Sequence, residues 1–417
     1  MRKTKTGRIA AIMLAGSAAS VAMSAANAEE IRFWTLAFAS ESATTAFNEM
    51  VAAFEAENPG VDIIVETRGV DEHRTALRLA ATAGQGPDIY FSWSGLGQSG
   101  SYVAAGLSEP MERYYQQYGW YDQYEPAAIA FAMYDANGEI HGAPFTVNGE
   151  AVYYNKALFE QAGITAEPQT YDELIAANDA LVAAGIPPWT FGGSVNWHLM
   201  RLTDVIVEHE CGAEMHDALV ARTVSWAEEP CVTAAFEEFH RWTENYILKP
   251  FMGIGQEQSF NLFVAGRAAM MLEGDWLVGQ LDQNGVLDAY DVFAFPTDTN
   301  RLYGFGQFYY ISAYSESKDM AAKFLDYINN AENSQRYLGN AGVLSMNRNV
   351  TYSYQRDLEN QWLEIFQTHD AIFMNSDLPF SAAQTDEYFR VLNSVADNTM
   401  DPAEAGAIFQ QFLTANP

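Results

Sequence analysis

The chain is poor in positive charge. Only 22 of its 417 residues are Lys or Arg, against 54 Asp or Glu, and the formal net charge is -32. Nucleic acids and anionic membrane surfaces are bound through clustered Lys and Arg, so this balance argues against both partners. It favours a ligand that is neutral or cationic.

Long apolar runs are missing after the N-terminal segment. No later stretch approaches the ~18–20 consecutive apolar residues that span a membrane. Apolar residues still make up 49% of the chain, which is ample for a packed core. Because 417 residues exceed the ~250–300 at which a single core stops growing, two lobes are expected.

The first 28 residues have the pattern of a secretory signal peptide. Residues 1–8 carry four positive charges, residues 9–26 are apolar and small, and Ala26-Asn27-Ala28 has the small-x-small pattern that signal peptidase cleaves. A membrane anchor is less favoured, because the stretch is rich in Ala, Ser and Gly. No cysteine lies near the cleavage point, so no lipid anchor is expected. Cleavage leaves a net charge of -32 - 4 = -36.

Cysteine is scarce as well. The chain has two, Cys211 and Cys231, both in the exported part. An oxidising compartment permits them to pair, so a disulfide is expected, with two free thiols as the alternative. Zinc is a weaker alternative, because the region has histidines but no CxxC or HExxH spacing. Those histidines are His198, His209, His216 and His240. Neither a metal site nor a cofactor is expected.

Apolar periodicity predicts alternating strands and helices at the start of the mature chain. Strands are expected at Ile31–Leu36, Val61–Thr67 and Pro87–Ser92, and helices at Ser42–Glu57 and Asp71–Ala83. A β-α-β-α-β run with short connections implies a largely parallel sheet with helices on its faces.

Ligands of such open sheets bind at the carboxyl ends of the strands, here residues 36–40 and 92–95. The second end leads into Gly95-Leu96-Gly97-Gln98-Ser99-Gly100, which matches the GxGxxG pattern of dinucleotide sites. The match is weak, because it follows the third strand rather than the first. The favoured interpretation is a loop that opens a helix, whose glycines let the backbone approach a ligand or a neighbouring lobe.

The remaining chain alternates further. A tight turn is expected at Asp135–Gly138, followed by a strand pair in HGAPFTVNGEAVYYN, residues 141–155. Later strands are expected at 268–272, 290–296 and 305–313, and helices at 156–162, 171–184, 200–209, 232–246, 258–265, from 275 onward, and at 317–329, 334–338, 355–368, 384–397 and 402–413. No flexible linker separates the lobes, so ordered hinge strands are expected to join them.

Aromatic residues are more informative than enzyme motifs. The sequence contains neither a GxSxG nucleophile elbow nor a P-loop, but it has 9 Trp, 22 Tyr and 25 Phe. Trp93, Trp197 and Trp276 fall at strand ends or in turns. Such a ring suits a sugar, because it covers an apolar C–H face while a nearby amide or carboxylate binds hydroxyls. For any single tryptophan, a place in the core is the favoured alternative.

Six segments follow one another in a specific order and spacing over nearly 390 residues. They are FNEMVAAFEAENPGVDIIVE, GPDIYF, HGAPFTVNGEAVYYNKALFEQAGI, FVAGRAAMMLEGDWLVGQL, YISAYSESKDMAAKFLDYI and AGVLSMNR. In these segments the mature chain resembles family 1 of the extracellular solute-binding proteins of ABC sugar importers, which includes maltose-binding protein.

The resemblance implies an α/β fold of two lobes, each a sheet flanked by helices, joined by hinge strands and closing around the ligand. The first lobe would comprise about 29–142 plus 300–345, and the second 143–299 plus 346–417. The chain would be no enzyme but a monomeric periplasmic protein. It would capture a neutral sugar, oligosaccharide or glycoside and deliver it to two permease subunits in the inner membrane. The same fold binding a polyamine, a glycerophosphodiester or an osmolyte is the alternative, and a secreted hydrolase is a more distant one.

The resemblance also implies ligand-binding positions. Those that match the family are Ser92, Trp93, Ser94, Asn148, Asp275, Trp276, Gly306 and Gln307, and loop location adds Phe38 and Trp197. Trp276 is expected to be the main apolar platform, facing the cleft after a turn at Gly274, with Asp275 accepting hydroxyl hydrogen bonds. Capping of the second lobe's core is the alternative for Trp276. Arg267 and Arg301 are the nearest cations in sequence, so an anionic ligand is expected to lack a partner.

The signal peptide predicts a mature N-terminus at Glu29. The intact mass of protein recovered from the periplasm should therefore equal that of residues 29–417. A periplasmic form that keeps residues 9–26 would contradict cleavage at this position.

Overall fold

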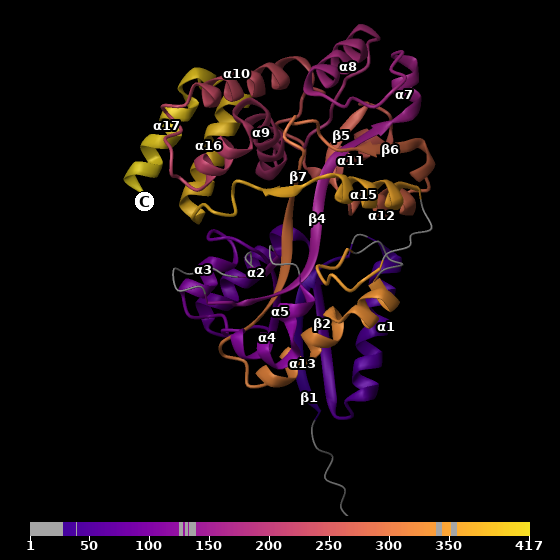
Figure 1. The fold of residues 1–417 in the computed structure, drawn as a ribbon, viewed down its shortest axis with the longest axis vertical. Coiled ribbons are helices and arrows are strands. Elements are labelled where there is room, and N and C mark those ends of the chain that lie inside the picture. The colour runs from indigo at the N-terminus through magenta and orange to yellow at the C-terminus, as the bar shows by residue number, and fades with distance from the viewer. Residues whose placement is uncertain are drawn as a thin grey trace, which may run out of the picture.

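The computed structural model describes residues 28–38, 40–124, 128–129, 132, 139–338, 344–351 and 357–417. Residues 1–27 of the expected signal peptide and the turn expected at 135–138 lie outside this part of the chain. The described residues form two lobes of strands and helices, and two long strands run through both lobes (Figure 1). This is the two-lobed α/β fold that the sequence predicts.

The first lobe is built mainly from the N-terminal part of the chain. It contains β1 (Glu29–Leu36), α1 (Glu41–Glu57), β2 (Val61–Arg68), α2 (Val70–Ala83), β3 (Ile89–Trp93), α3 (Ser99–Ala104), α4 (Glu112–Tyr118) and α5 (Trp120–Gln123), and later α13 (Lys318–Asn329), α14 (Ala331–Asn333) and the π-helix η2 (Ser334–Leu338). The long strands are β4 (Gly142–Asn155) and β7 (Arg301–Ile311).

The second lobe holds most of the remaining helices. It contains α7 (Lys156–Gln161), α8 (Tyr171–Ala183), α9 (Asn196–Val220), α10 (Pro230–Asn245), α11 (Gln256–Val264), β5 (Met270–Gly274), α12 (Leu277–Gln283), η1 (Leu287–Ala289), β6 (Tyr290–Phe293), α15 (Asp357–Thr368), β8 (Ala371–Met374), α16 (Ala382–Ala396) and α17 (Pro402–Ala415).

The β-α-β-α-β run at the start of the chain is confirmed. β1 pairs in parallel with both β2 and β3. α1 covers the sheet because Phe47, Met50 and Phe54 share one helical face, and all three are buried. The helix begins where Ser40 Oγ accepts a hydrogen bond from the backbone N–H of Ala43 at 3.1 Å.

The strand pair expected at residues 141–155 is wrong, because β4 is a single strand of 14 residues. Its first part pairs antiparallel with β7, and its last part pairs with β5 and β6. β7 in turn pairs with β3 in the first lobe and with β8 in the second. Each part of β4 therefore has its own partners, and the strand stays extended from lobe to lobe. Pro144 has no N–H and lies at a shift of register, not at a turn.

Each lobe packs its own apolar core. In the first lobe, Phe33, Phe91 and Tyr309 belong to one buried cluster. In the second lobe, the largest cluster includes Trp189 and Trp242. Because the two clusters are separate, apolar packing holds each lobe together without filling the space between them.

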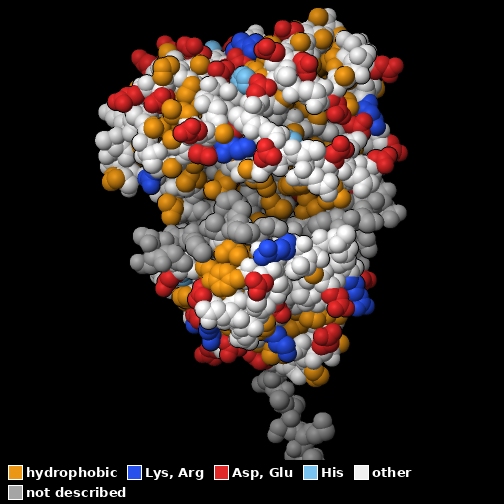
Figure 2. All heavy atoms as spheres, viewed as in Figure 1, with side chains coloured by type: hydrophobic (Ala, Val, Ile, Leu, Met, Phe, Trp, Pro, Cys, Tyr) orange, Lys and Arg blue, Asp and Glu red, His pale blue; other side chains and the backbone are white. Residues whose placement is uncertain are grey.

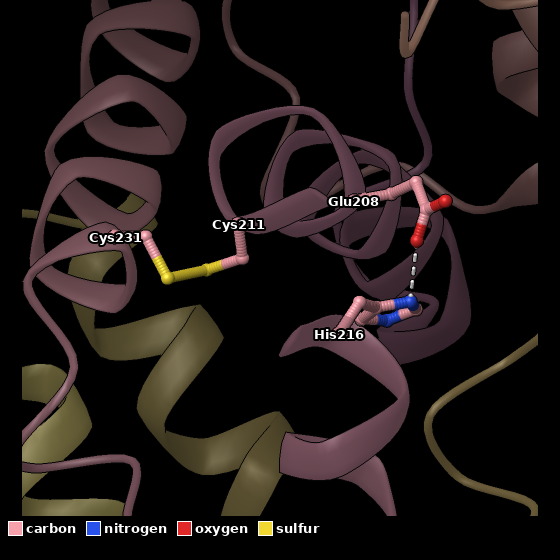
Figure 3. Close-up of a disulfide and its surroundings, with 4 residues drawn as sticks. All are labelled: Glu208, Cys211, His216 and Cys231. Carbon is pink, nitrogen blue, oxygen red and sulfur yellow. Dashed lines mark ion pairs between the residues drawn. A yellow bond between two sulfur atoms is a disulfide. The ribbon is translucent and has the colours of Figure 1, made fainter. Parts of the chain in front are cut away.

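The two cysteines form a disulfide in the second lobe. α9 extends beyond the helix expected at 200–209 and has a break at Gly212, where φ is 73°. Cys211 lies just before this break, and Cys231 lies in the first turn of α10. Their sulfur atoms are 2.04 Å apart and their Cα atoms 5.0 Å apart (Figure 3). The bridge therefore ties the break in α9 to the start of α10.

Loss of this bridge should destabilise the protein. For a sequence separation of 20, the double substitution Cys211→Ala/Cys231→Ala should lower the free energy of unfolding by roughly 3 kcal/mol, because the unfolded chain regains freedom. Chemical denaturation measures the change, and reduced wild-type protein should fall to the same level. Two titratable thiols in denatured, unreduced wild-type protein would contradict the bridge.

Candidate functional site

A cavity of about 660 Å³ lies between the two lobes. The first lobe contributes residues 35–38 at the end of β1 and Trp93 at the end of β3. The second lobe contributes Trp197 at the start of α9, and Asp275 and Trp276 after β5. The carboxyl ends of β1 and β3 therefore open on the cavity, as expected for an open sheet. Figure 2 shows apolar side chains gathered in the hollow between the lobes.

Seven of the ten expected ligand-binding residues line this cavity. They are Phe38, Trp93, Asn148, Trp197, Asp275, Trp276 and Gln307. Ser92 and Ser94 are buried and do not line the cavity; Ser92 precedes Trp93 in β3, where successive side chains point to opposite faces, and Ser94 follows the strand. The Cα–H of Gly306 points toward Met346 and away from the cavity, since a Cβ at this position would lie 2.6 Å from Met346 Cε. A binding role for the seven residues stays a prediction.

Trp276 owes its position to the missing side chain of Gly274. The indole lies directly over this glycine, so closely that a Cβ at 274 would be 1.9 Å from Trp276 Cζ3. The sequence had suggested a turn at this glycine, but it is the last residue of β5. Gly274 therefore acts through close contact, and any larger residue would push the indole out of its place. Phe305 lies beside the indole at 5.8 Å between ring centroids.

Asp275 lines the cavity, and its carboxylate is mostly buried. The residue is only 8% exposed, and Asn148 Nδ2 donates a hydrogen bond to Asp275 Oδ1 at 2.6 Å. The other oxygen, Oδ2, is buried and has no hydrogen-bond partner among the described residues. Burial raises the pKa of Asp275 to about 7, although the hydrogen bond from Asn148 acts to lower it. An acceptor of this kind suits a ligand that carries hydroxyl groups.

Arg201 lies beneath the two tryptophans of the second lobe. Its guanidinium carbon is 4.2 Å from the ring centroid of Trp197 and 5.3 Å from that of Trp276. The side chain is almost fully buried and contacts two acids, with Nε 2.9 Å from Glu150 Oε1 and Nη1 2.8 Å from Glu273 Oε2. The cation therefore contacts both indoles while its own charge is balanced from behind.

The two acids of this cluster differ in protonation. Burial raises the pKa of Glu150 to about 8, in spite of the nearby Arg201. Burial acts in the same direction on Glu273, but Arg201 and His198 outweigh it and hold the pKa of Glu273 at about 2. Glu273 is thus the principal counter-ion of Arg201, and the cluster is close to neutral at pH 7.

Sequence reasoning missed Arg201, although a signal for it was present. Trp197 and Arg201 are four residues apart within α9, and side chains at this spacing are neighbours on a helix surface. A tryptophan with an arginine four residues later therefore indicates a stacked pair, once the helix is known to begin before Trp197.

The expectation that cations would be distant from the site is wrong. Arg68, Arg74 and Arg201 all line the cavity. Arg68 forms an ion pair with Glu66, and Arg74 stacks on Trp93 at 4.7 Å from the ring centroid. Arg68 and Arg74 are brought in by the fold from other segments of the chain, so distance along the sequence gave no sign of them.

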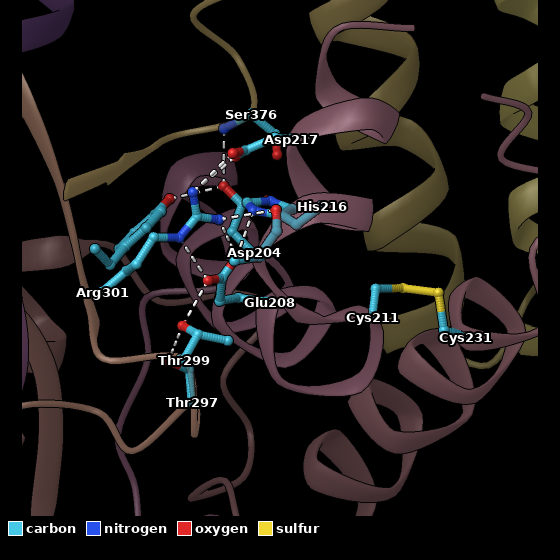
Figure 4. Close-up of polar contacts among 12 residues, drawn as sticks. Asp204, Glu208, Cys211, His216, Asp217, Cys231, Thr297, Thr299, Arg301 and Ser376 are labelled. Carbon is cyan, nitrogen blue, oxygen red and sulfur yellow. Dashed lines mark hydrogen bonds and ion pairs between the residues drawn. A yellow bond between two sulfur atoms is a disulfide. The ribbon is translucent and has the colours of Figure 1, made fainter. Parts of the chain in front are cut away.

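Arg301 belongs to a different cluster. Its Nη2 pairs with Glu208 at 2.7 Å and its Nη1 with Asp217 at 2.9 Å (Figure 4). Burial raises the pKa of Glu208, but hydrogen bonds from His216, Arg301 and Thr299 outweigh it and hold the pKa at about 2. Arg301 is therefore a structural counter-ion that joins β7 to α9.

The overall pattern of the chain matches one protein family. Residues 49–361, about three quarters of the chain, match the model of the bacterial extracellular solute-binding proteins. The chain belongs to this family. Its members are binding proteins. No helix in the described ranges is long and apolar enough to cross a membrane.

Individual relatives have low sequence identity to this chain, but the alignments cover most of its length. A binding protein of Brucella abortus (strain 2308) is 27% identical over 354 residues, which is 84% of this chain and 82% of that one. A Rhizobium meliloti (strain 1021) protein, named a probable sugar-binding periplasmic protein, is 29% identical over 67% of this chain and 65% of its own. A solved structure from work on xylan utilization by the thermophilic bacterium Caldanaerobius polysaccharolyticus superposes with a TM-score of 0.81, at 25% identity, over 92% of this chain and 100% of that one.

Asp275 makes the stability of the protein depend on pH. Its folded-state pKa of about 7 lies above the ~3.9 of an unfolded aspartate, so its contribution to stability is present below pH ~4 and is lost as pH rises through about 7. Asp275→Asn should therefore raise the melting temperature at pH 8, and this gain should shrink toward pH 4. Asp288→Asn, at an exposed position, serves as the control. An equal change at both pH values would contradict the role of Asp275.

Proposed function

We propose that this solute-binding protein captures a neutral sugar, oligosaccharide or glycoside for an ABC importer. The observation that carries the proposal is the combination of aromatic rings and oxygen acceptors in one cavity. Trp276 lies beside Asp275 in the second lobe, and Trp93 and Phe38 line the cavity from the first lobe. The sugar-binding name of the Rhizobium relative and the xylan context of the similar structure support the same ligand class.

The energetics of the cavity favour such a ligand. An indole face against a pyranose ring buries enough apolar area to contribute about 2–3 kcal/mol. A ligand hydroxyl that donates a hydrogen bond to Asp275 adds about 1.5–3 kcal/mol above its pKa of about 7, where the carboxylate is ionised. A volume of about 660 Å³ is typical of sites for small molecules. The arginines that line the cavity already contact acids or rings, so a neutral ligand fits better than an anionic one.

Binding would close the lobes around the ligand. We place the first lobe at 29–142 plus 300–345 and the second at 143–299 plus 346–417, with β4 and β7 as the hinge. The closed monomer would present the rims of both lobes to two permease subunits in the inner membrane. In this account the protein reaches the periplasm through its signal peptide, begins at Glu29 and carries no lipid anchor.

Isothermal calorimetry against a panel of sugars, polyamines and phosphodiesters tests the ligand class. At least one sugar should bind, while polyamines and phosphodiesters should not. Tight binding of a polyamine or a phosphodiester, with no sugar bound, would overturn the carbohydrate assignment and leave the receptor role intact.

Trp276→Ala tests the apolar platform. The loss of about 2–3 kcal/mol of stacking should weaken sugar binding some 30-fold or more, since ~1.4 kcal/mol is a factor of ten, with little loss of thermal stability. Tyr121→Ala removes an exposed ring of the first lobe and should leave affinity unchanged. If Trp276 were core instead, stability should drop by ~3–5 kcal/mol. A stable Trp276→Ala variant with unchanged affinity would refute the platform.

A further inference from the structure

The glycine-rich loop after β3 contacts the other lobe. The backbone N–H of Leu96 donates a hydrogen bond to the carbonyl oxygen of Leu378 at 2.6 Å. Gly95 makes this approach possible, because its φ is +119° and a Cβ there would lie only 2.3 Å from the same oxygen. Leu378 belongs to the segment between β8 and α16 of the second lobe.

The contact continues through the next two residues of the loop. A Cβ on Gly97 would lie 2.6 Å from the carbonyl oxygen of Phe380, so only glycine lets the two backbones lie this close. Gln98 Nε2 then donates a hydrogen bond to Asp377 Oδ2 at 3.2 Å. Backbone and side-chain contacts together thus join residues 95–98 to residues 377–380.

Both sides of the contact are braced by their own lobe. In the second lobe Phe380 is fully buried and packs against Tyr388 and Phe409. In the first lobe Ser99 Oγ donates a hydrogen bond to the carbonyl oxygen of Trp93 at 2.9 Å. In Figure 1, α3, which follows the loop, lies below α16. Motion of either segment is therefore coupled to motion of its lobe.

The GxGxxG pattern is accounted for by this contact. In a dinucleotide site the glycines leave room for a pyrophosphate. Here the space beside Gly95 and Gly97 is filled by the backbone of residues 378–382. The pattern therefore serves an approach of two protein backbones.

We propose that residues 95–98 and 377–380 form an inter-lobe latch that sets the balance between open and closed forms. Neither segment belongs to the strands β4 and β7, which connect the lobes covalently. The latch contacts are not covalent, so they form when the lobes are together and break when they separate. Since apparent affinity scales with the population of the binding-competent form, the latch also tunes ligand affinity.

Small-angle scattering of the ligand-free exported protein tests the latch. Gly97→Ala places a methyl group against the Phe380 carbonyl, so its radius of gyration should exceed that of the wild type. Gly253→Ala is the matched control, because Gly253 is exposed and a Cβ there would meet nothing within 4 Å. An unchanged radius in a folded Gly97→Ala variant would overturn the proposal.

If Gly97→Ala does not fold, a second variant tests the same contact. Gln98→Leu removes only the hydrogen bond to Asp377, and it should also increase the ligand-free radius. A wild-type radius for Gln98→Leu would count against the latch. Both measurements are made without ligand, so their outcome does not depend on the proposed sugar. Once the panel identifies a ligand, a fall of the closed population to about a tenth should weaken binding roughly tenfold.

Discussion

The antiparallel ladder between β4 and β7 is the constraint on which the rest of the structure depends. Its register runs from Gly142 opposite Tyr310 to Glu150 opposite Tyr303, so the same two strands serve both lobes. Near its second-lobe end Gly149 faces Gly304, and a Cβ on Gly304 would lie 2.3 Å from the carbonyl oxygen of Asn148. The two strands are therefore closely paired where they pass from lobe to lobe, which supports the proposed motion of whole lobes.

The β4–β7 ladder also positions the cavity between the lobes. Asn148 on β4 and Gln307 on β7 line the cavity, so the hinge strands form part of its wall. Glu150, also on β4, pairs with Arg201 of α9, and Arg201 lies beneath Trp197 and Trp276. Without the cation, Glu273 would stay buried with its counter-ion removed, which is strongly destabilising. The aromatic platform and the buried charges are therefore one unit.

Local periodicity predicted those parts of the fold that depend on neighbours in sequence. β1 to β3 and most of the long helices were found because their apolar spacing is regular over many residues, while α9 was predicted only over 200–209. The short helices α4 and α5 were missed, since seven and four residues do not span a periodic window. The continuity of β4 was missed for another reason: it depends on pairing with β7, more than 150 residues later in the chain.

The candidate site was predictable to a similar degree and for the same reason. Phe38, Trp93 and Trp276 follow recognisable strands, so their place at the carboxyl ends could be inferred from the sequence. Arg68 and Arg74 could not, because they reach the cavity only once β2 and α2 have packed. No sequence spacing or motif links these two arginines to the residues of the second lobe.

The strongly negative net charge of the chain is not found in the cavity, because the acids there are partly neutral. Burial raises the pKa of Asp377 to about 6, in spite of nearby Arg74, and holds the pKa values of Asp275 and Glu150 at about 7 and 8. These acids are therefore less charged than acids at the surface, while the arginines beside them keep their charge. The excess of 54 acids over 22 bases thus acts mainly at the solvent-facing surface, where it favours solubility. The rings of the cavity therefore favour a neutral ligand, and its arginines disfavour a cationic one.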